Sequence, residues 1–217
     1  MFKSLFLAAC LFLSSLTLES KSIEQHVYDT GVIVLVERSD SEYQCSGTLI
    51  GRQDLKYTVL TAAHCKPEPD ALGDWSYVVL PDRASDAWKA SATILILGNK
   101  SKGQDYLLLS FTSTEYLDIA ELDQTFPKLG EQVLSNATPG ATNMKVLLEG
   151  IVAKPLSELD DSFWPKAALV QIFGTGPGAS GGGIFTKSGK LCGVIVGGTG
   201  NNLTVILPLA ILEGLNE

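Results

Sequence analysis

Short runs of apolar and β-branched residues alternate with turn residues along most of the chain. In the first half these runs occupy 31–37, 43–51, 56–62, 75–80, 87–97 and 106–111. In the second half they occupy 131–135, 145–154, 168–173, 183–186, 190–197 and 202–207. Runs of this length, separated by Gly, Pro, Asn and Asp, are typical of β-strands. Only the end of the chain differs, since Pro208 opens a stretch to residue 215 that predicts a short C-terminal helix.

The runs form two sets of six, separated by a mixed, acidic connection at about 112–130. Six short strands are enough to close a barrel. A chain of 217 residues that is 45% hydrophobic can also bury a core of this size. The sequence therefore predicts an all-β fold of two packed six-stranded antiparallel barrels. The first covers about 26–115 and the second about 116–217.

The N-terminal residues have the pattern of a targeting segment. A basic start at Lys3 is followed by an apolar run over 5–18 and then by small or polar residues. This run is shorter than the roughly 17 apolar residues of a spanning helix. It therefore predicts a secretory signal peptide over 1–20 rather than a membrane anchor, and a mature domain over 21–217. Residues 7–10 resemble a lipoprotein cleavage box, but they lie very early and further apolar sequence follows them.

The charge of the chain limits its partners. The formal net charge is −8, and Lys and Arg form no local cluster. Nucleic-acid binding requires a basic surface that can neutralise phosphates. We therefore expect no nucleic-acid partner and, once the signal peptide is removed, no stable membrane span.

A glycine-dense stretch over 173–183 has Ser180 near its centre. Gly178 and Gly181 flank the serine, and glycine adopts positive φ without the steric cost that a Cβ carries. Such a backbone can turn its N–H groups inward. The stretch is therefore typical of a nucleophile on a tight loop, although a plain turn would also account for it when it is taken alone.

Two further segments favour the nucleophile. The sequence Val-Leu-Thr-Ala-Ala-His-Cys ends at Cys65 and contains His64, and Asp105 opens the apolar run Tyr-Leu-Leu-Leu. With Ser180 they follow the order His, Asp, Ser. These segments resemble the chymotrypsin-like serine peptidases, whose triad has the same chain order. The resemblance covers nearly all of the mature chain, and it is nearest the bacterial glutamyl-endopeptidase and trypsin-like branch because 180–198 aligns without a gap.

The resemblance implies an acyl-transfer site in the cleft between the barrels. Ser180 would be the nucleophile, His64 the general base and Asp105 the residue that orients the imidazole. The N–H groups of Gly178 and Ser180 would form the oxyanion hole. This chemistry needs neither a cofactor nor a metal ion. The partners that it implies are polypeptide substrates and protein inhibitors.

Other titratable residues fit these roles less well. Asp86 and Asp118 do not open an apolar run of the kind that follows Asp105. His26, the only other histidine, lies near the mature N-terminus, where we expect a solvated tail residue.

Three of the four cysteines remain after signal removal. The resemblance implies a disulfide between Cys45 and Cys65, which joins the strand before the histidine loop to the residue after the histidine. Cys192 is then left over. Its apolar neighbours indicate a buried strand, where a thiol behaves as a small hydrophobe.

The resemblance also locates the pocket for the residue before the cleaved bond. Trypsin-like relatives have an aspartate six positions before the nucleophile, where this chain has Gly174. The glutamyl-specific branch pairs a threonine with a histidine, where this chain has Thr175 and Ile195. An uncharged floor does not offset the desolvation of a buried charge, so we expect cleavage after uncharged residues. The remaining expected pocket residues are Val196, Gly197 and Gly198.

Ala179 replaces the aspartate that pairs with a new N-terminus in animal digestive relatives. We therefore expect maturation to need little beyond signal removal or trimming near 21–25. The first hypothesis is a secreted or periplasmic serine endopeptidase, and the alternative is a catalytically silent binding module on the same fold. The sequence does not determine the oligomeric state.

Overall fold

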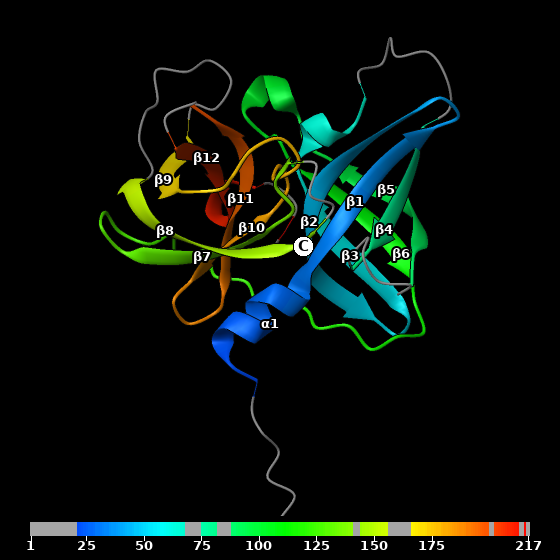
Figure 1. Ribbon diagram of the computed structural model, residues 1–217, viewed down its shortest axis with the longest axis horizontal. Coiled ribbons are helices and arrows are strands. Elements are labelled where there is room, and N and C mark those ends of the chain that lie inside the picture. Colours follow the sequence, from blue (N-terminus) through cyan, green and yellow to red (C-terminus); the bar gives the residue numbers. More distant parts are fainter. Residues whose placement is uncertain are drawn as a thin grey trace, which may run out of the picture.

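The computed structural model describes residues 21–67, 75–81, 88–140, 144–155, 166–199, 202–212 and 215. Within them the strands form two closed barrels, which Figure 1 shows side by side. All strand pairs in both barrels are antiparallel. The predicted fold class is therefore confirmed, while the predicted signal peptide lies outside the described residues.

The first barrel has the strand order β1-β2-β3-β6-β5-β4. Its strands are β1 (Gly31–Arg38), β2 (Ser41–Gln53), β3 (Lys56–Thr61), β4 (Ser76–Leu80), β5 (Ala90–Leu97) and β6 (Leu107–Thr112). β3 pairs with β6 from Lys56 opposite Thr112 to Thr61 opposite Leu107. This register brings the segment after β3 next to the segment before β6, and these two segments carry His64 and Asp105.

The second barrel has the strand order β10-β11-β12-β9-β8-β7. Its strands are β7 (Gln132–Ala137), β8 (Val146–Lys154), β9 (Ala168–Ile172), β10 (Gly183–Thr186), β11 (Leu191–Gly198) and β12 (Leu203–Pro208). All twelve strands overlap the runs expected from the sequence. The connection between the barrels pairs with the second one, since Leu122 forms a parallel bridge with Leu191.

A helix before the first strand was not expected from the sequence. α1 (Ile23–Thr30) begins after Ser22, whose hydroxyl accepts a hydrogen bond from the Gln25 N–H at 3.2 Å. Ser22 and Gln25 have the spacing of a capping box, a signal visible in the sequence. Figure 1 shows α1 beneath the junction of the barrels, and it packs against β7, β8, β1 and β2. The helix therefore contacts both barrels.

His26 is part of α1, so its description as a solvated tail residue is wrong. Its side chain is 35% exposed, and its Nδ1 lies 3.9 Å from a carboxylate oxygen of Asp118. Lys21 also bonds to Asp118, at 2.6 Å, and to Asp29, at 2.9 Å. The hydrogen bond to Asp118, followed by the one to Asp29, raises the pKa of Lys21. The segment around Lys21 and α1 is thus held to the connection between the barrels.

The side chain of Asn136, at the end of β7, attaches α1 to both barrels. Its Nδ2 donates to the Val27 carbonyl and to the Thr30 hydroxyl, each at 3.1 Å. Its Oδ1 accepts from the Thr48 hydroxyl at 3.1 Å and from the Gly183 N–H at 2.9 Å. Asn136 is fully buried, so these four bonds satisfy a carboxamide that has no access to water.

The predicted C-terminal helix over 208–215 corresponds to one short 3₁₀ helix, Leu209–Ile211. Pro208 belongs to β12 rather than to the helix. The described residues include two other 3₁₀ helices, Ala63–Cys65 after β3 and Lys100–Lys102 after β5. No helix among the described residues is long and apolar enough to cross a membrane.

Candidate active site

His64 and Asp105 form a two-point contact. The Asp105 Oδ2 lies 2.8 Å from the His64 Nδ1, and its Oδ1 accepts the His64 backbone N–H at 2.8 Å. The Asp105 side chain is 5% exposed, whereas the imidazole is 32% exposed. An ionised carboxylate only accepts hydrogen bonds, so Nδ1 carries the proton. The other ring nitrogen, Nε2, is then free to accept a proton, as a general base requires.

The loop that carries Ser180 is anchored to both barrels. The Ser180 carbonyl accepts the Ser46 N–H from β2 at 2.8 Å. The next residue, Gly181, donates its N–H to the Ile195 carbonyl of β11, also at 2.8 Å. Gly181 has φ +87, and a Cβ there would overlap the Ser46 carbonyl. Only glycine therefore fits where the nucleophile loop crosses against β2.

The expected oxyanion donors are available. Gly178 has φ +93, a conformation that glycine adopts readily. Within the part of the chain that the structure describes, neither the Gly178 N–H nor the Ser180 N–H donates to another protein group. Two unpaired backbone donors beside a serine can receive a negatively charged oxygen.

A hollow of about 340 Å³ adjoins Ser180. It is lined by Thr175, Gly176, Pro177, Ala179, Ser180, Ile195, Gly197, Gly198, Asn202 and Leu203. None of these residues has a charged side chain. The Thr175 hydroxyl lies 2.9 Å from the hydroxyl of Thr204, which is buried in β12. The two hydroxyls therefore satisfy each other rather than pointing unpaired into the hollow.

Two of the six expected pocket residues do not line this hollow. Val196 is 2% exposed and packs in the core, and Gly174, at φ +88, lies in the turn after β9. Thr175, Ile195, Gly197 and Gly198 do line it. Sequence reasoning missed five lining residues. Three of them, Gly176, Pro177 and Ala179, could have been inferred from their position beside Ser180, whereas Asn202 immediately precedes β12 and Leu203 is its first residue.

The sequence matches the family described as "Trypsin-like peptidase domain" over residues 45–194. This match covers more than half of the chain and includes the segments of His64, Asp105 and Ser180. The chain belongs to the trypsin-like peptidase family. The expected membership of the chymotrypsin-like serine endopeptidases is thus confirmed, while the glutamyl-endopeptidase branch stays a prediction. No curated protein sequence matches the chain.

Solved structures show the same fold for this trypsin-like domain. A serine endoprotease from Yersinia pestis superposes with a TM-score of 0.67 at 17% identity, over 88% of this chain and 64% of that one. The active form of the Rv3671c protease from M. tuberculosis gives 0.67 at 14% identity, over 86% and 79%. Its inactive form gives 0.63 at 15%, over 86% and 87%. This chain therefore spans just under two thirds of the Yersinia protein.

The disulfide implied by the family resemblance is present in the trypsin-like domain. Cys45 and Cys65 are bonded, with their Cα atoms 6.3 Å apart. The bond joins β2 to the 3₁₀ helix that contains His64. Cys192 is a free, buried thiol whose Sγ lies 3.3 Å from the Ile184 carbonyl oxygen. Burial raises the pKa of the Cys192 thiol to about 12, so it remains protonated and unreactive at neutral pH.

Asp118, one of the two rival acidic residues, does not join the site. Asp118 bonds to Lys21 and lies near His26, as described above. Asp86 lies outside the described residues. Among those described, no three His, Cys, Asp or Glu side chains gather closely enough to hold a metal ion.

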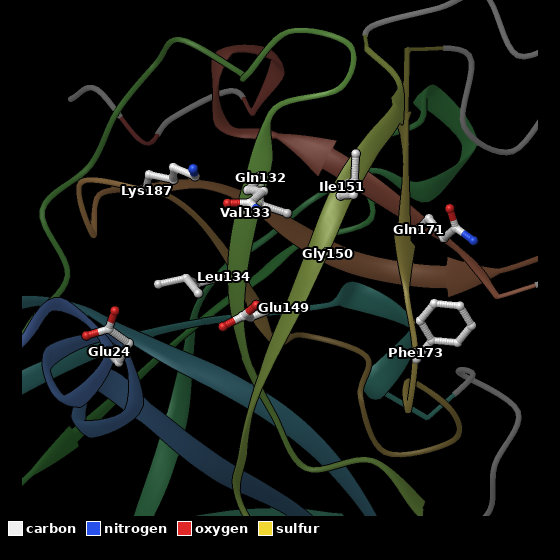
Figure 2. A pocket seen from close by; sticks show the side chains of 10 residues that line it. All are labelled: Glu24, Gln132, Val133, Leu134, Glu149, Gly150, Ile151, Gln171, Phe173 and Lys187. Atoms are coloured by element: carbon white, nitrogen blue, oxygen red, sulfur yellow. The ribbon is translucent and has the colours of Figure 1, made fainter.

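A second hollow of this trypsin-like domain, of about 380 Å³, lies on the outer face of the second barrel. Figure 2 shows side chains from α1, β7, β8, β9 and the turns after β9 and β10 around it, among them Glu24, Glu149 and Phe173. His64, Asp105 and Ser180 are not among its lining residues. It is therefore separate from the site of His64, Asp105 and Ser180.

Proposed function

We propose that this domain is an exported serine endopeptidase that hydrolyses polypeptides through Ser180, His64 and Asp105. The observation that carries the proposal is the pair of 2.8 Å contacts between Asp105 and His64. A nearly buried carboxylate that holds both the ring and the backbone of a histidine fixes the orientation and the tautomer of the imidazole. This is the task of the third member of a serine protease triad.

In the proposed reaction the Ser180 Oγ attacks the carbonyl carbon of the cleaved peptide bond while His64 takes the hydroxyl proton at Nε2. The carbonyl oxygen becomes an oxyanion that accepts bonds from the N–H groups of Gly178 and Ser180. One such donor is worth on the order of 10²–10³ in rate. His64 then gives the proton to the leaving amine, and a water molecule, deprotonated by the same histidine, releases the acyl group from Ser180.

The substrate residue before the cleaved bond is proposed to be uncharged, and apolar or aromatic more than acidic or basic. The hollow beside Ser180 has no charged lining residue, and its Thr175 hydroxyl is already bonded to Thr204. A cation or a carboxylate entering it would lose its hydration without gaining a counter-charge, at a cost of several kcal/mol. A peptide-library profile dominated by Arg, Lys or Glu before the cut would contradict this specificity.

Export is proposed on two grounds. Residues 1–20 have the sequence pattern of a signal peptide, and 21–217 would then be the mature domain. The Cys45–Cys65 disulfide is of a kind that persists in oxidising compartments such as the periplasm or the extracellular space. Mass spectrometry of protein recovered outside the cytoplasm should find a mature N-terminus close to residue 21.

A fluorophosphonate tests the catalytic proposal. The purified protein should be labelled at Ser180, and Ser180→Ala and His64→Ala should each lower kcat by about 10⁶, with effects that do not add. Ser188→Ala, which removes a hydroxyl bonded to Thr186 in an exposed turn, is the matched control and should keep full activity. Absence of labelling in folded protein would favour the silent binding module, and activity retained by Ser180→Ala would refute the triad.

A further inference from the structure

The N–H, carbonyl and hydroxyl of Ser46, on β2, are all hydrogen-bonded, either to the loop that carries Ser180 or to a residue next to this loop. It is 1% exposed and follows the disulfide residue Cys45. Its N–H donates to the Ser180 carbonyl at 2.8 Å, and its carbonyl accepts the Thr61 hydroxyl at 2.7 Å. Its own hydroxyl lies 2.7 Å from the Gly178 carbonyl oxygen. A side chain of the first barrel therefore reaches the loop of the second barrel that supplies both expected oxyanion donors.

The surroundings of the Ser46 hydroxyl determine where its single hydrogen goes. The Thr138 N–H, which can only donate, lies 2.8 Å from the Ser46 Oγ, and the Thr138 hydroxyl lies at the same distance. The Gly178 carbonyl can only accept. The Thr138 hydroxyl also lies 3.5 Å from the Gly178 carbonyl oxygen, but the Ser46 hydroxyl is much nearer to it at 2.7 Å. Donating the Ser46 hydrogen to Gly178 leaves Thr138 to donate both of its hydrogens to Ser46, and all bonding groups are then satisfied. The hydroxyl is thus a directed donor to the Gly178 carbonyl.

Hydrogen bonds hold the peptide planes on both sides of Gly178. The Pro177 carbonyl accepts the Gly140 N–H at 2.5 Å, and no peptide bond among the described residues is cis. In a trans peptide the N–H points opposite to the carbonyl, so the Gly178 N–H points away from Gly140. On the other side Ser46 fixes the Gly178 carbonyl. Because glycine crosses easily between positive and negative φ, these bonds, rather than local sterics, keep Gly178 at φ +93.

We propose that Ser46 is a positioning residue for the oxyanion hole, whose hydroxyl, together with the Gly140 N–H on the preceding peptide, keeps the Gly178 N–H turned toward the nucleophile. This inference rests on the proposed peptidase function. Ser46 acts through Gly178 and does not contact the reacting atoms. It couples the two barrels at the site, because the strand that is bonded through Cys45 to the histidine segment also holds the Gly178 carbonyl and so helps to keep an oxyanion donor of the other barrel in place.

The test compares Ser46→Ala with Thr48→Val, which removes another buried β2 hydroxyl, one that bonds to Asn136 instead of the loop. Active sites are counted with a fluorophosphonate, so that kcat is expressed per competent site. Removing one oxyanion donor costs about 10²–10³, and loosening its support should cost about 10-fold in kcat. KM should change by less than about 3-fold, because the effect concerns the transition state. Thr48→Val should keep the wild-type kcat per site.

A peptide boronate that matches the preferred substrate supplies a second measurement. Its tetrahedral adduct on Ser180 places an oxygen in the oxyanion hole, so its inhibition constant should rise in Ser46→Ala by about the same factor as kcat falls. A purely structural role would lower the melting temperature or the number of titrated sites and leave both values unchanged. Wild-type kcat per site and wild-type boronate affinity in Ser46→Ala would overturn the proposal.

Ser46→Gly keeps the proposal testable if the alanine variant does not fold. The smaller residue leaves room for a water that can satisfy the Thr138 N–H, yet a mobile water holds the Gly178 carbonyl less firmly. Its kcat per site should also fall, and a wild-type value would overturn the proposal. Failure of the peptidase function itself is a different result, because then the wild-type protein would neither be labelled nor cleave peptides.

Discussion

Replacing Asn136 by alanine should lower the free energy of unfolding more than replacing Ser46 or Thr48, two other buried hydrogen-bonding residues discussed above. The carboxamide joins α1, β2 and the first residue of β10 through four bonds. Without it, the buried Gly183 N–H and the Thr48 hydroxyl lose their acceptor. The Val27 carbonyl is less affected, because it still accepts the Thr30 hydroxyl at 2.8 Å.

The expected loss of stability follows from these two buried donors that are left without an acceptor. A buried donor left without a partner costs about 1–3 kcal/mol, so two such donors predict a loss of about 2–6 kcal/mol in the free energy of unfolding. This is a large part of the roughly 5–15 kcal/mol that stabilises a typical domain. Thr48→Val strands no second group, because the Asn136 Oδ1 keeps its bond to Gly183, and should cost about 1 kcal/mol.

Denaturant unfolding with the disulfide intact measures these differences. Asn136→Asp serves as a matched variant, since it keeps the shape but directs a second acceptor at the Val27 carbonyl and buries a charge at neutral pH. It should therefore be destabilising although nothing is removed from the core. A loss below about 1 kcal/mol in Asn136→Ala, or wild-type stability in Asn136→Asp, would refute the view that the hydrogen bonds of this side chain hold α1 to the barrels.

Three further predictions concern the cysteines and the nucleophile loop. The Cys45–Cys65 bond joins residues 20 positions apart, so its reduction should lower the free energy of unfolding by about 3 kcal/mol in the chain-entropy model. An unchanged denaturation curve in the presence of reductant would contradict this. Burial raises the folded-state pKa of Cys192 from about 9.0 to about 12. The unfolded thiol therefore ionises first, so the stability that this buried thiol contributes is complete below pH 9 and is lost as the pH rises toward 12. Iodoacetamide at pH 8 should accordingly modify Cys192 only after unfolding, which peptide mapping would detect. Gly181→Ala should fail to fold stably, because a Cβ there overlaps the β2 backbone, whereas Gly176→Ala, which has open space, should keep the wild-type melting temperature.

The strands were predictable because each apolar run is local and is bounded by turn residues. Most observed bounds differ from the predicted ones by one or two residues. The order of His64, Asp105 and Ser180 was also visible in the sequence. Their contacts were not, because the Asp105–His64 pair depends on the register of β3 against β6, which sequence patterns do not specify.

α1 was missed because little of what holds it is local. Its eight residues include only two buried ones, Val27 and Thr30, and an isolated helix of this length is unstable in water. The spacing of Ser22 and Gln25 could have indicated where it begins. Asn136, whose side chain bonds to Val27 and Thr30, lies more than a hundred residues further along the chain. A reading of neighbouring residues cannot detect such contacts.

The attachment of α1 also bears on the order in which the protein can fold. The helix comes near the start of the chain, but the Asn136 amide that bonds to Val27 follows 109 residues later. The Lys145 ammonium, which bonds to the Gly31 carbonyl at 2.9 Å and lies over the Tyr28 ring, follows Gly31 by 114 residues. In a chain that emerges from its N-terminus, the first barrel can close while this helix is still undocked. The helix would then dock only after β7 and β8 have formed. A truncated chain that lacks these strands should therefore leave its N-terminal segment exposed to proteolysis.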